Sequence, residues 1–143
     1  MTYLGKGERL SRGKDKKSSE LAVITKAKDL CSYVFLVTQK SPKQFRFTFT
    51  GRMQNLCLDI VENLYLANEC FVGGIDAERN YHKRLNYQHK ALTQIKLLAY
   101  FAQLAEEQKA ILPKQFAHTA KLSTDCQYLV AGWIKSDKTR FRK

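Results

Sequence analysis

Apolar residues recur at intervals of three and four along four long stretches of this chain of 143 residues, and this spacing restricts its fold more than any other feature. Such spacing places the apolar side chains on one face of a helix, whereas a half-buried strand would require strict alternation. In one stretch the recurring positions are Phe49, Met53, Leu56, Ile60, Leu64 and Ala67. In another the predicted core seam is Tyr81, Leu85, Gln88, Leu92, Ile95, Ala99 and Ala102. Each stretch is therefore predicted to be a helix that buries one face.

Prolines and paired glycines separate these stretches. Pro42 disfavours a helical conformation in the residue before it, Gly73 and Gly74 end a second pattern, and Pro113 suits the first turn of a new helix. The predicted helices cover residues 18–38, from 48–50 to 70, 77–110 and 113–136. Short connections favour neighbours that run in opposite directions, so we predict an all-α fold, an antiparallel up-down four-helix bundle. The β-branched and aromatic residues 31–38 leave a strand as the local alternative.

The two ends of the chain are basic. Residues 1–17 hold three of the seven glycines and six basic residues, so we expect a flexible basic arm there. The bundle is then expected over residues 18–136, with a second basic tail over residues 137–143. No run of about 18 apolar residues could cross a bilayer, and the N-terminus lacks an apolar leader. We therefore expect a cytoplasmic protein without membrane contact.

The charge balance favours an anionic partner. Lys and Arg number 25 against 13 Asp and Glu, which gives a net charge of +12 at pH 7. So large an excess repels itself unless an anion offsets it, and nucleic acid is the commonest such partner.

One face of the predicted helix over residues 77–110 is basic. At 100° per residue its cations fall within an arc of about 140°: they are Arg79, Lys83, Lys90 and Lys96. The acidic residues of this segment are confined to its ends, so the cations lack the paired opposite charges that a solvated helix face commonly has. We predict contact with nucleic-acid phosphates; a merely solvated face is the alternative.

A second basic group lies near residue 50, where cations alternate with aromatic rings. The cations are Lys43, Arg46 and Arg52, and the rings are Phe45, Phe47 and Phe49. This alternation is typical of sites that stack bases beside phosphate contacts. The three rings could equally close one end of the bundle, and the sequence leaves both interpretations open.

No motif indicates catalysis, a cofactor or a metal. Cys31, Cys57, Cys70 and Cys126 are too far apart for zinc-binding pairs, and we expect the three within helical patterns to be buried and reduced. His82 and His89 lie two helical turns apart, too far to share a metal without a third ligand. We therefore predict a protein that is not an enzyme, with no catalytic residue, no cofactor and no metal site.

Two motifs resemble the accessory variability determinant (Avd) family of four-helix-bundle proteins. The first combines Pro42-Lys43, Arg46-Phe47-Thr48 and Arg52-Met53-Gln54-Asn55-Leu56, and resembles the family's usual PKS-RYTLG-RI-NL. The second, Ala131-Gly132-Trp133-Ile134-Lys135-Ser136, resembles its GGWIKS ending. The chain departs from the family at Phe47, where tyrosine is common, at Phe49, where leucine is, and at Ala131, where glycine is. The resemblance covers residues 20–136.

The resemblance implies a pentamer of basic bundles that associates with the reverse transcriptase of a diversity-generating retroelement and with its template RNA. Such a protein supports mutagenic cDNA synthesis without being an enzyme. The expected partners are thus RNA and/or DNA, a reverse transcriptase and further copies of the chain. The alternatives are a ribosomal-RNA intervening-sequence-type bundle protein and a basic protein–protein adaptor. The intervening-sequence branch carries a run SIPANIAEG where this chain has residues 58–64, LDIVENL.

Overall fold

The computed structural model describes the backbone of residues 12–141 and the side chains of residues 22–141. Within that range the chain forms four long helices and no strand: α1 (Arg12–Thr38), α2 (Gly51–Glu69), α3 (Ala77–Glu107) and α4 (Pro113–Phe141). The predicted all-α class with four helices is confirmed. The local alternative of a strand over residues 31–38 is wrong, because these residues complete α1.

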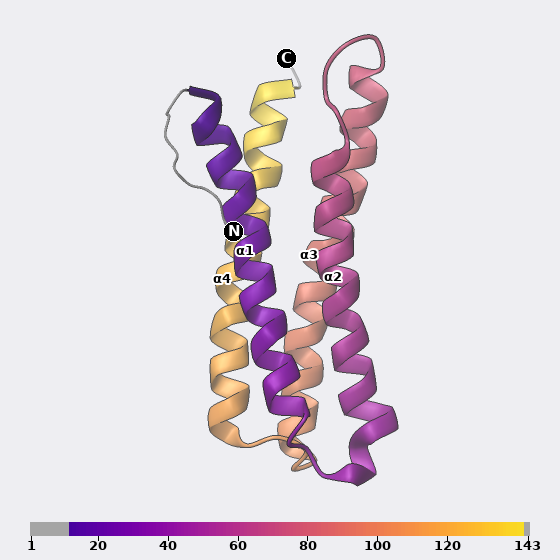
Figure 1. The fold of residues 1–143 in the computed structure, drawn as a ribbon, viewed down its shortest axis with the longest axis vertical. Helices are drawn as coiled ribbons and strands as arrows, with labels where there is room; N and C mark the ends of the chain where they lie inside the picture. Colours follow the sequence, from indigo (N-terminus) through magenta and orange to yellow (C-terminus); the bar gives the residue numbers. More distant parts are fainter. Residues whose placement is uncertain (1–11, 142–143) are drawn as a thin grey trace.

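The four helices lie side by side around a shared core. In Figure 1 the chain descends along α1, returns along α2, descends along α3 and returns along α4. Each helix packs against the next, and α1 also packs against α4, so the four helices close into a ring. The loop between α1 and α2 lies at one end of the molecule. The loop between α2 and α3 lies at the other end, with the last residues of α4 (Figure 1).

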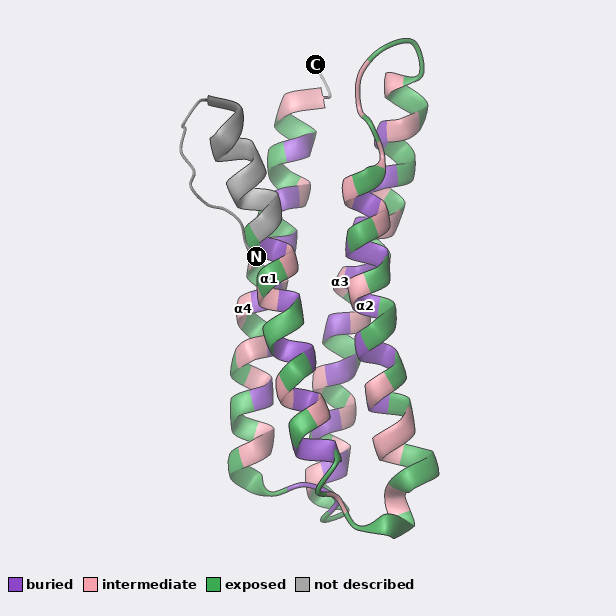
Figure 2. Cartoon of the chain, viewed as in Figure 1, coloured by how far each residue is buried: buried purple, intermediate pink, exposed green. Residues whose placement is uncertain are grey.

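The buried residues face the interior of this ring along its whole length (Figure 2). The predicted seam of α2 is confirmed: Met53, Leu56, Ile60, Leu64 and Ala67 are all buried. Phe49, at the start of that seam, is half-buried and packs against the core. The core is thus built by the three- and four-residue spacing that the sequence carries.

The buried stripe of α3 is rotated relative to the predicted one. Tyr81, Gln88, Ile95 and Ala102 are buried as expected, but the predicted seam members Leu85, Leu92 and Ala99 are only half-buried. Three other residues of α3 take the fully buried positions: Arg84, Ala91 and Leu98. The rotation brings a charged side chain into the interior, where it meets a partner from α4.

Both predicted ends of the bundle need correction. α1 begins at Arg12 and not at Ser18, so residues 12–17 of the expected arm are helical. Lysine and arginine are good helix formers, and two serines inside a helix cost little. Residues 1–11 of the arm lie outside the described residues.

The expected C-terminal tail is also largely helix. α4 continues through residue 137 to Phe141, and Asp137 is fully buried. A buried carboxylate has to be paired, and its partners on α3 and α4 hold this last turn in the helix. Residues 142–143 lie outside the described part of the chain.

The connections follow local rules of helix capping. Lys109 has a φ of 66° just after α3, and Ala110 N–H donates to the carbonyl of Ala105 at 2.7 Å, as in a Schellman motif. The side chain of Gln115 then accepts a hydrogen bond from Leu112 N–H at 2.8 Å, which caps the start of α4. Among the described residues, no helix is both long and apolar enough to cross a membrane.

Candidate nucleic-acid interface

The four cations predicted to lie on one face of α3 are all exposed. Arg79, Lys83, Lys90 and Lys96 extend to solvent, and the two histidines between them, His82 and His89, are exposed as well. Along the helix axis, Lys83 lies about 10 Å from Lys90, and Lys90 lies about 9 Å from Lys96, with the four cations spread over an arc of about 140°. We call these four cations the α3 basic face.

The members of the α3 basic face differ in their partners. Arg79 Nη2 lies 2.7 Å from Asp76 Oδ1, so an adjacent carboxylate offsets part of its charge. Lys83, Lys90 and Lys96 make no ion pair with any described residue. Three unneutralised ammonium groups along a rigid helix can each replace a counterion on a phosphate backbone.

A fifth cation of α3 has a different environment. Arg84 Nε donates to Asp137 Oδ2 at 2.7 Å, and Arg84 Nη2 donates to Asp137 Oδ1 at 3.1 Å. Gln88 Nε2 and Arg140 Nη2 donate to the same carboxylate at 2.9 Å each. The guanidinium of Arg84 also lies 5.0 Å from the centre of the Trp133 ring. This buried network ties α3 to α4, and we call the end of the bundle that contains it the Asp137 end.

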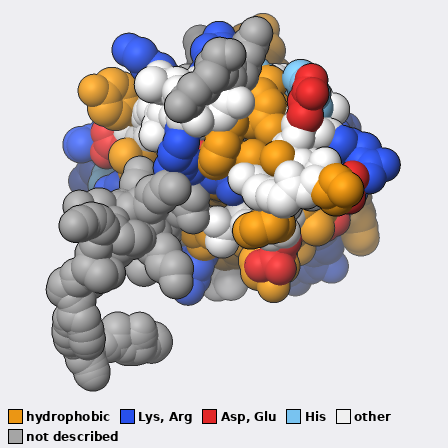
Figure 3. Space-filling model, turned by 90° about the horizontal axis from the view of Figure 1, so that it is seen from above, with side chains coloured by type: hydrophobic (Ala, Val, Ile, Leu, Met, Phe, Trp, Pro, Cys, Tyr) orange, Lys and Arg blue, Asp and Glu red, His pale blue; other side chains and the backbone are white. Residues whose placement is uncertain are grey.

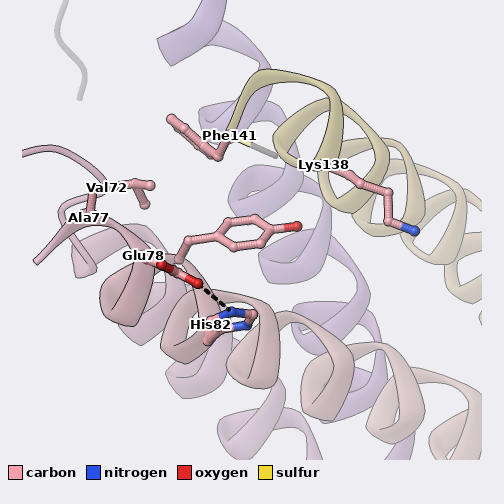
Figure 4. Close-up of a pocket in the computed structure, with 7 residues that line it drawn as sticks. Val72, Ala77, Glu78, His82, Lys138 and Phe141 are labelled. Carbon is pink, nitrogen blue, oxygen red and sulfur yellow. Dashed lines mark ion pairs between the residues drawn. The ribbon is translucent and has the colours of Figure 1, made fainter. Parts of the chain in front are cut away.

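A cavity of about 900 Å³ opens beside this network. It is lined by residues of the α2–α3 loop, α3 and α4: Val72, Ala77, Glu78, Tyr81, His82, Lys138 and Phe141. Figure 4 shows His82 facing Glu78, with Phe141 and Lys138 on α4 across from them. His82 Nε2 lies 4.0 Å from Glu78 Oε2. In the view onto this end, hydrophobic side chains gather near the centre, with Lys and Arg around the margin (Figure 3).

Lys138 is a cation whose position is not evident from the sequence. It belongs to the stretch predicted to be a basic tail, but on α4 it lines the same cavity as His82 of α3. A helical pattern continued beyond residue 136 would have placed it there. Asp137 would still have argued against this continuation, because an aspartate on a core-facing position looks unfavourable until its partner is known.

The second predicted basic group lies at the opposite end of the bundle, in the turns before α2. Lys43–Phe45 forms a 3₁₀ turn and Arg46–Thr50 a π-helical turn, and α2 follows directly. Lys43, Arg46 and Arg52 are all exposed, and none makes an ion pair with a described residue. We call this part of the molecule the Phe47 end.

The three phenylalanines of this region do not behave alike. Phe45 and Phe49 are half-buried against the core, with their ring centres 5.9 Å apart. Phe47 is 88% exposed. Of the two interpretations that the sequence left open, closing the bundle therefore applies to Phe45 and Phe49 and fails for Phe47.

Two of the interior cysteines, Cys57 and Cys126, are unsuited to act as nucleophiles. Cys31, Cys57 and Cys126 are buried, as predicted, and all four cysteines are free thiols. A hydrogen bond with Cys31, together with burial, raises the pKa of Cys57, and burial raises the pKa of Cys126 to about 12. Both thiols are therefore protonated at neutral pH and cannot act as thiolate nucleophiles. No group of three or more His, Cys, Asp or Glu side chains is placed to hold a metal within the described residues.

Comparison with protein-family models and with curated proteins finds no match to this chain. The resemblance to the Avd family therefore rests on the two sequence motifs and the four-helix layout. In the structure, Arg46, Phe47 and Arg52 of the first motif lie at the Phe47 end, and Trp133 of the second is buried in the network at the Asp137 end.

Proposed function

We propose that this protein is a non-catalytic nucleic-acid-binding subunit, an antiparallel four-helix bundle that grips RNA or DNA through phosphates. The observation that carries this proposal is the row of Lys83, Lys90 and Lys96 on α3, exposed and without a carboxylate partner among the described residues. A solvated helix face gains stability from opposite charges three or four residues apart, and this row forgoes that gain. A polyanion would supply the missing charge.

The binding mode follows from the kind of cation. Lysine ammonium groups about 10 Å apart along a helix meet phosphates as point charges and do not reach base edges in a defined geometry. Backbone contacts of this kind position a protein on nucleic acid without selecting a sequence. The proposed subunit therefore has little sequence preference, and its affinity depends strongly on salt.

We further propose that the subunit acts in the cytoplasm as a pentamer, beside a reverse transcriptase and its template RNA. This part of the proposal is supported by the two motifs that resemble the Avd family and by the all-α fold. Gene neighbourhood tests it directly. An adjacent reverse transcriptase gene with a repeated template sequence supports the proposal, and a location inside a ribosomal RNA gene overturns it in favour of an intervening-sequence protein.

The nucleic-acid part is tested by binding of fluorescent RNA and DNA oligonucleotides between 50 and 200 mM salt. We expect affinity to fall steeply over this range, because each neutralised phosphate makes the slope of log K against log salt more negative by about 0.9 for duplex DNA. Replacing Lys83, Lys90 and Lys96 together by glutamate should abolish binding while helicity is kept.

The matched control reverses three exposed lysines elsewhere, namely Lys28, Lys114 and Lys135, and changes the net charge equally. It should retain binding if the α3 basic face is the site. An equal loss of nucleic-acid affinity in both variants would mean that overall charge causes the loss, and α3 would no longer be the proposed site. A protein that purifies without nucleic acid and ignores it at low salt would support the adaptor alternative instead.

A further inference from the structure

Phe47 stands out at its end of the bundle because its exposed ring borders a cavity. A single exposed apolar side chain needs no explanation, but Phe47 also lines a hollow of about 200 Å³. The other lining residues are Thr48, Phe49, Arg52, Phe101 and Leu104. Residues from the turns before α2, from α2 and from the last turns of α3 thus meet at one site.

The size and lining of this hollow suit one flat ring system. Sites that enclose drug-sized ligands measure about 300–1,000 Å³, so a hollow of about 200 Å³ accepts a ring but not a whole nucleotide. Three of its lining residues are phenylalanines, whose faces favour offset or edge contacts with another ring. The exposed face of Phe47 is the one most open to such a contact, since Phe49 and Phe101 are half-buried.

The one charged residue that lines the hollow within the described part of the chain is an arginine, Arg52. The guanidinium of Arg46 lies 6.0 Å from the centre of the Phe47 ring, and that of Arg52 lies 5.4 Å from the centre of the Phe101 ring. Neither arginine makes an ion pair with a described residue, and no carboxylate lines the hollow among the described residues. An occupant with a flat apolar ring and an attached anion matches both features of the site.

We propose that the Phe47 end binds an unpaired base of single-stranded nucleic acid, an inference that rests on the proposed function. The base lies against Phe47 at the mouth of the hollow, and Arg46 and Arg52 hold the flanking phosphates. A base in a duplex has both faces covered by its neighbours and cannot reach the ring. The α3 basic face contacts any phosphate backbone, whereas the Phe47 end distinguishes single strands from duplexes.

The test compares a short single-stranded oligonucleotide with a duplex of the same length, using Phe47→Ala. Loss of one stacking contact should weaken single-strand binding by about five- to hundredfold, and duplex binding should change less than twofold. Phe47→Trp should restore single-strand binding, because any aromatic face can stack on a base. Tyr128→Ala is the matched control, since Tyr128 is 80% exposed on α4 and lines none of the cavities described above. It should leave both affinities unchanged.

Two further measurements identify the base as the ligand. A single-stranded oligonucleotide with abasic sites should bind wild type and Phe47→Ala equally. In Phe47→Trp, single-stranded nucleic acid should quench the new tryptophan, whereas wild type, whose only tryptophan is buried Trp133, should show little quenching.

Equal losses for single strand and duplex in Phe47→Ala would overturn the stacking site, and so would no loss for either. Both results would leave the proposed function standing, because wild-type binding and its salt dependence are measured in the same titrations. Competition by an acidic peptide but not by single-stranded nucleic acid would assign the hollow to a protein partner and overturn the inference. Wild type that binds no nucleic acid at low salt would end the proposed function and this inference together.

Discussion

The Asp137 end and the Phe47 end of the bundle both set arginines against aromatic rings, but their charges have different fates. Arg84 lies 5.0 Å from the Trp133 ring, is buried, and donates two hydrogen bonds to Asp137. Arg52 lies 5.4 Å from the Phe101 ring, is exposed, and has no carboxylate partner among the described residues.

The difference shows that an arginine on an aromatic ring does not by itself indicate a function. Burial and the presence of a carboxylate decide whether the charge stabilises the fold or remains available to a ligand. At the Asp137 end the carboxylate satisfies the charge within the chain, and removing one partner from such a pair is costly. At the Phe47 end the charge faces water, where a phosphate can reach it.

The largest expected effect comes from removing the buried carboxylate. Asp137→Ala removes a fully buried carboxylate that pairs with buried Arg84 at 2.7 Å, and it should lower the free energy of unfolding by about 3–5 kcal/mol. Urea denaturation followed by circular dichroism measures this change. Asp125→Ala is the control, because Asp125 Oδ2 pairs with Lys121 Nζ at 3.1 Å near the surface, and it should cost less than about 1 kcal/mol. Similar losses for the two variants would contradict the structural role of the Asp137 end.

The aromatic residue of the Asp137 end should also contribute more to the free energy of unfolding than that of the Phe47 end. Trp133→Ala removes a buried ring and should cost about 3–5 kcal/mol in the free energy of unfolding. Phe47→Ala removes an exposed ring and should stay within about 0.5 kcal/mol of wild type. Thermal and urea denaturation of both variants checks this. A strongly destabilised Phe47→Ala would mean that Phe47 supports the fold, and the comparison between the ends would fail.

Arg52→Ala sharpens the comparison by separating binding from stability. Loss of one phosphate-contacting cation should lower the salt slope of nucleic-acid binding by about 1 and weaken binding to all sequences alike. The free energy of unfolding should change by no more than about 0.5 kcal/mol. Arg84→Ala should show the reverse pattern, with a large loss of stability. Salt titrations and denaturation of the two variants decide whether Arg52 serves binding and Arg84 serves stability.

The smallest expected effect concerns Arg79, which is exposed like Arg52 and paired with a carboxylate like Arg84. It belongs to the exposed α3 basic face, yet its guanidinium pairs with Asp76 at 2.7 Å. Arg79→Ala should therefore weaken nucleic-acid binding less than Lys90→Ala does. Asp76→Ala should strengthen binding by about two- to fivefold at low salt, because it frees the Arg79 charge. Equal effects of the Arg79 and Lys90 variants would show that the ion pair with Asp76 does not make the Arg79 charge less available to a phosphate.

The exposed cations were largely predictable from sequence, and the polar interior was not. All seven predicted nucleic-acid-binding residues are exposed. For the five that lie on α2 and α3, helical periodicity separates the solvent face from the core face. The burial of Asp137 could not be predicted, because its partner Arg84 lies 53 residues away in the sequence and no local pattern indicates the pair. The distinct exposure of Phe47 among three similar residues depends on the irregular turns before α2, which helical periodicity does not describe.

The sequence by itself determined that this chain forms four helices, where three of them begin and which faces carry the lysines. These properties depend on spacing and capping within a few residues of chain. Only the tertiary structure decided that Arg84 and Asp137 enter the core, that α4 runs on to Phe141, and that Phe47 meets Arg52 and Phe101 at one hollow. A charge can be buried, or a ring left exposed beside others, only through neighbours that distant parts of the chain supply.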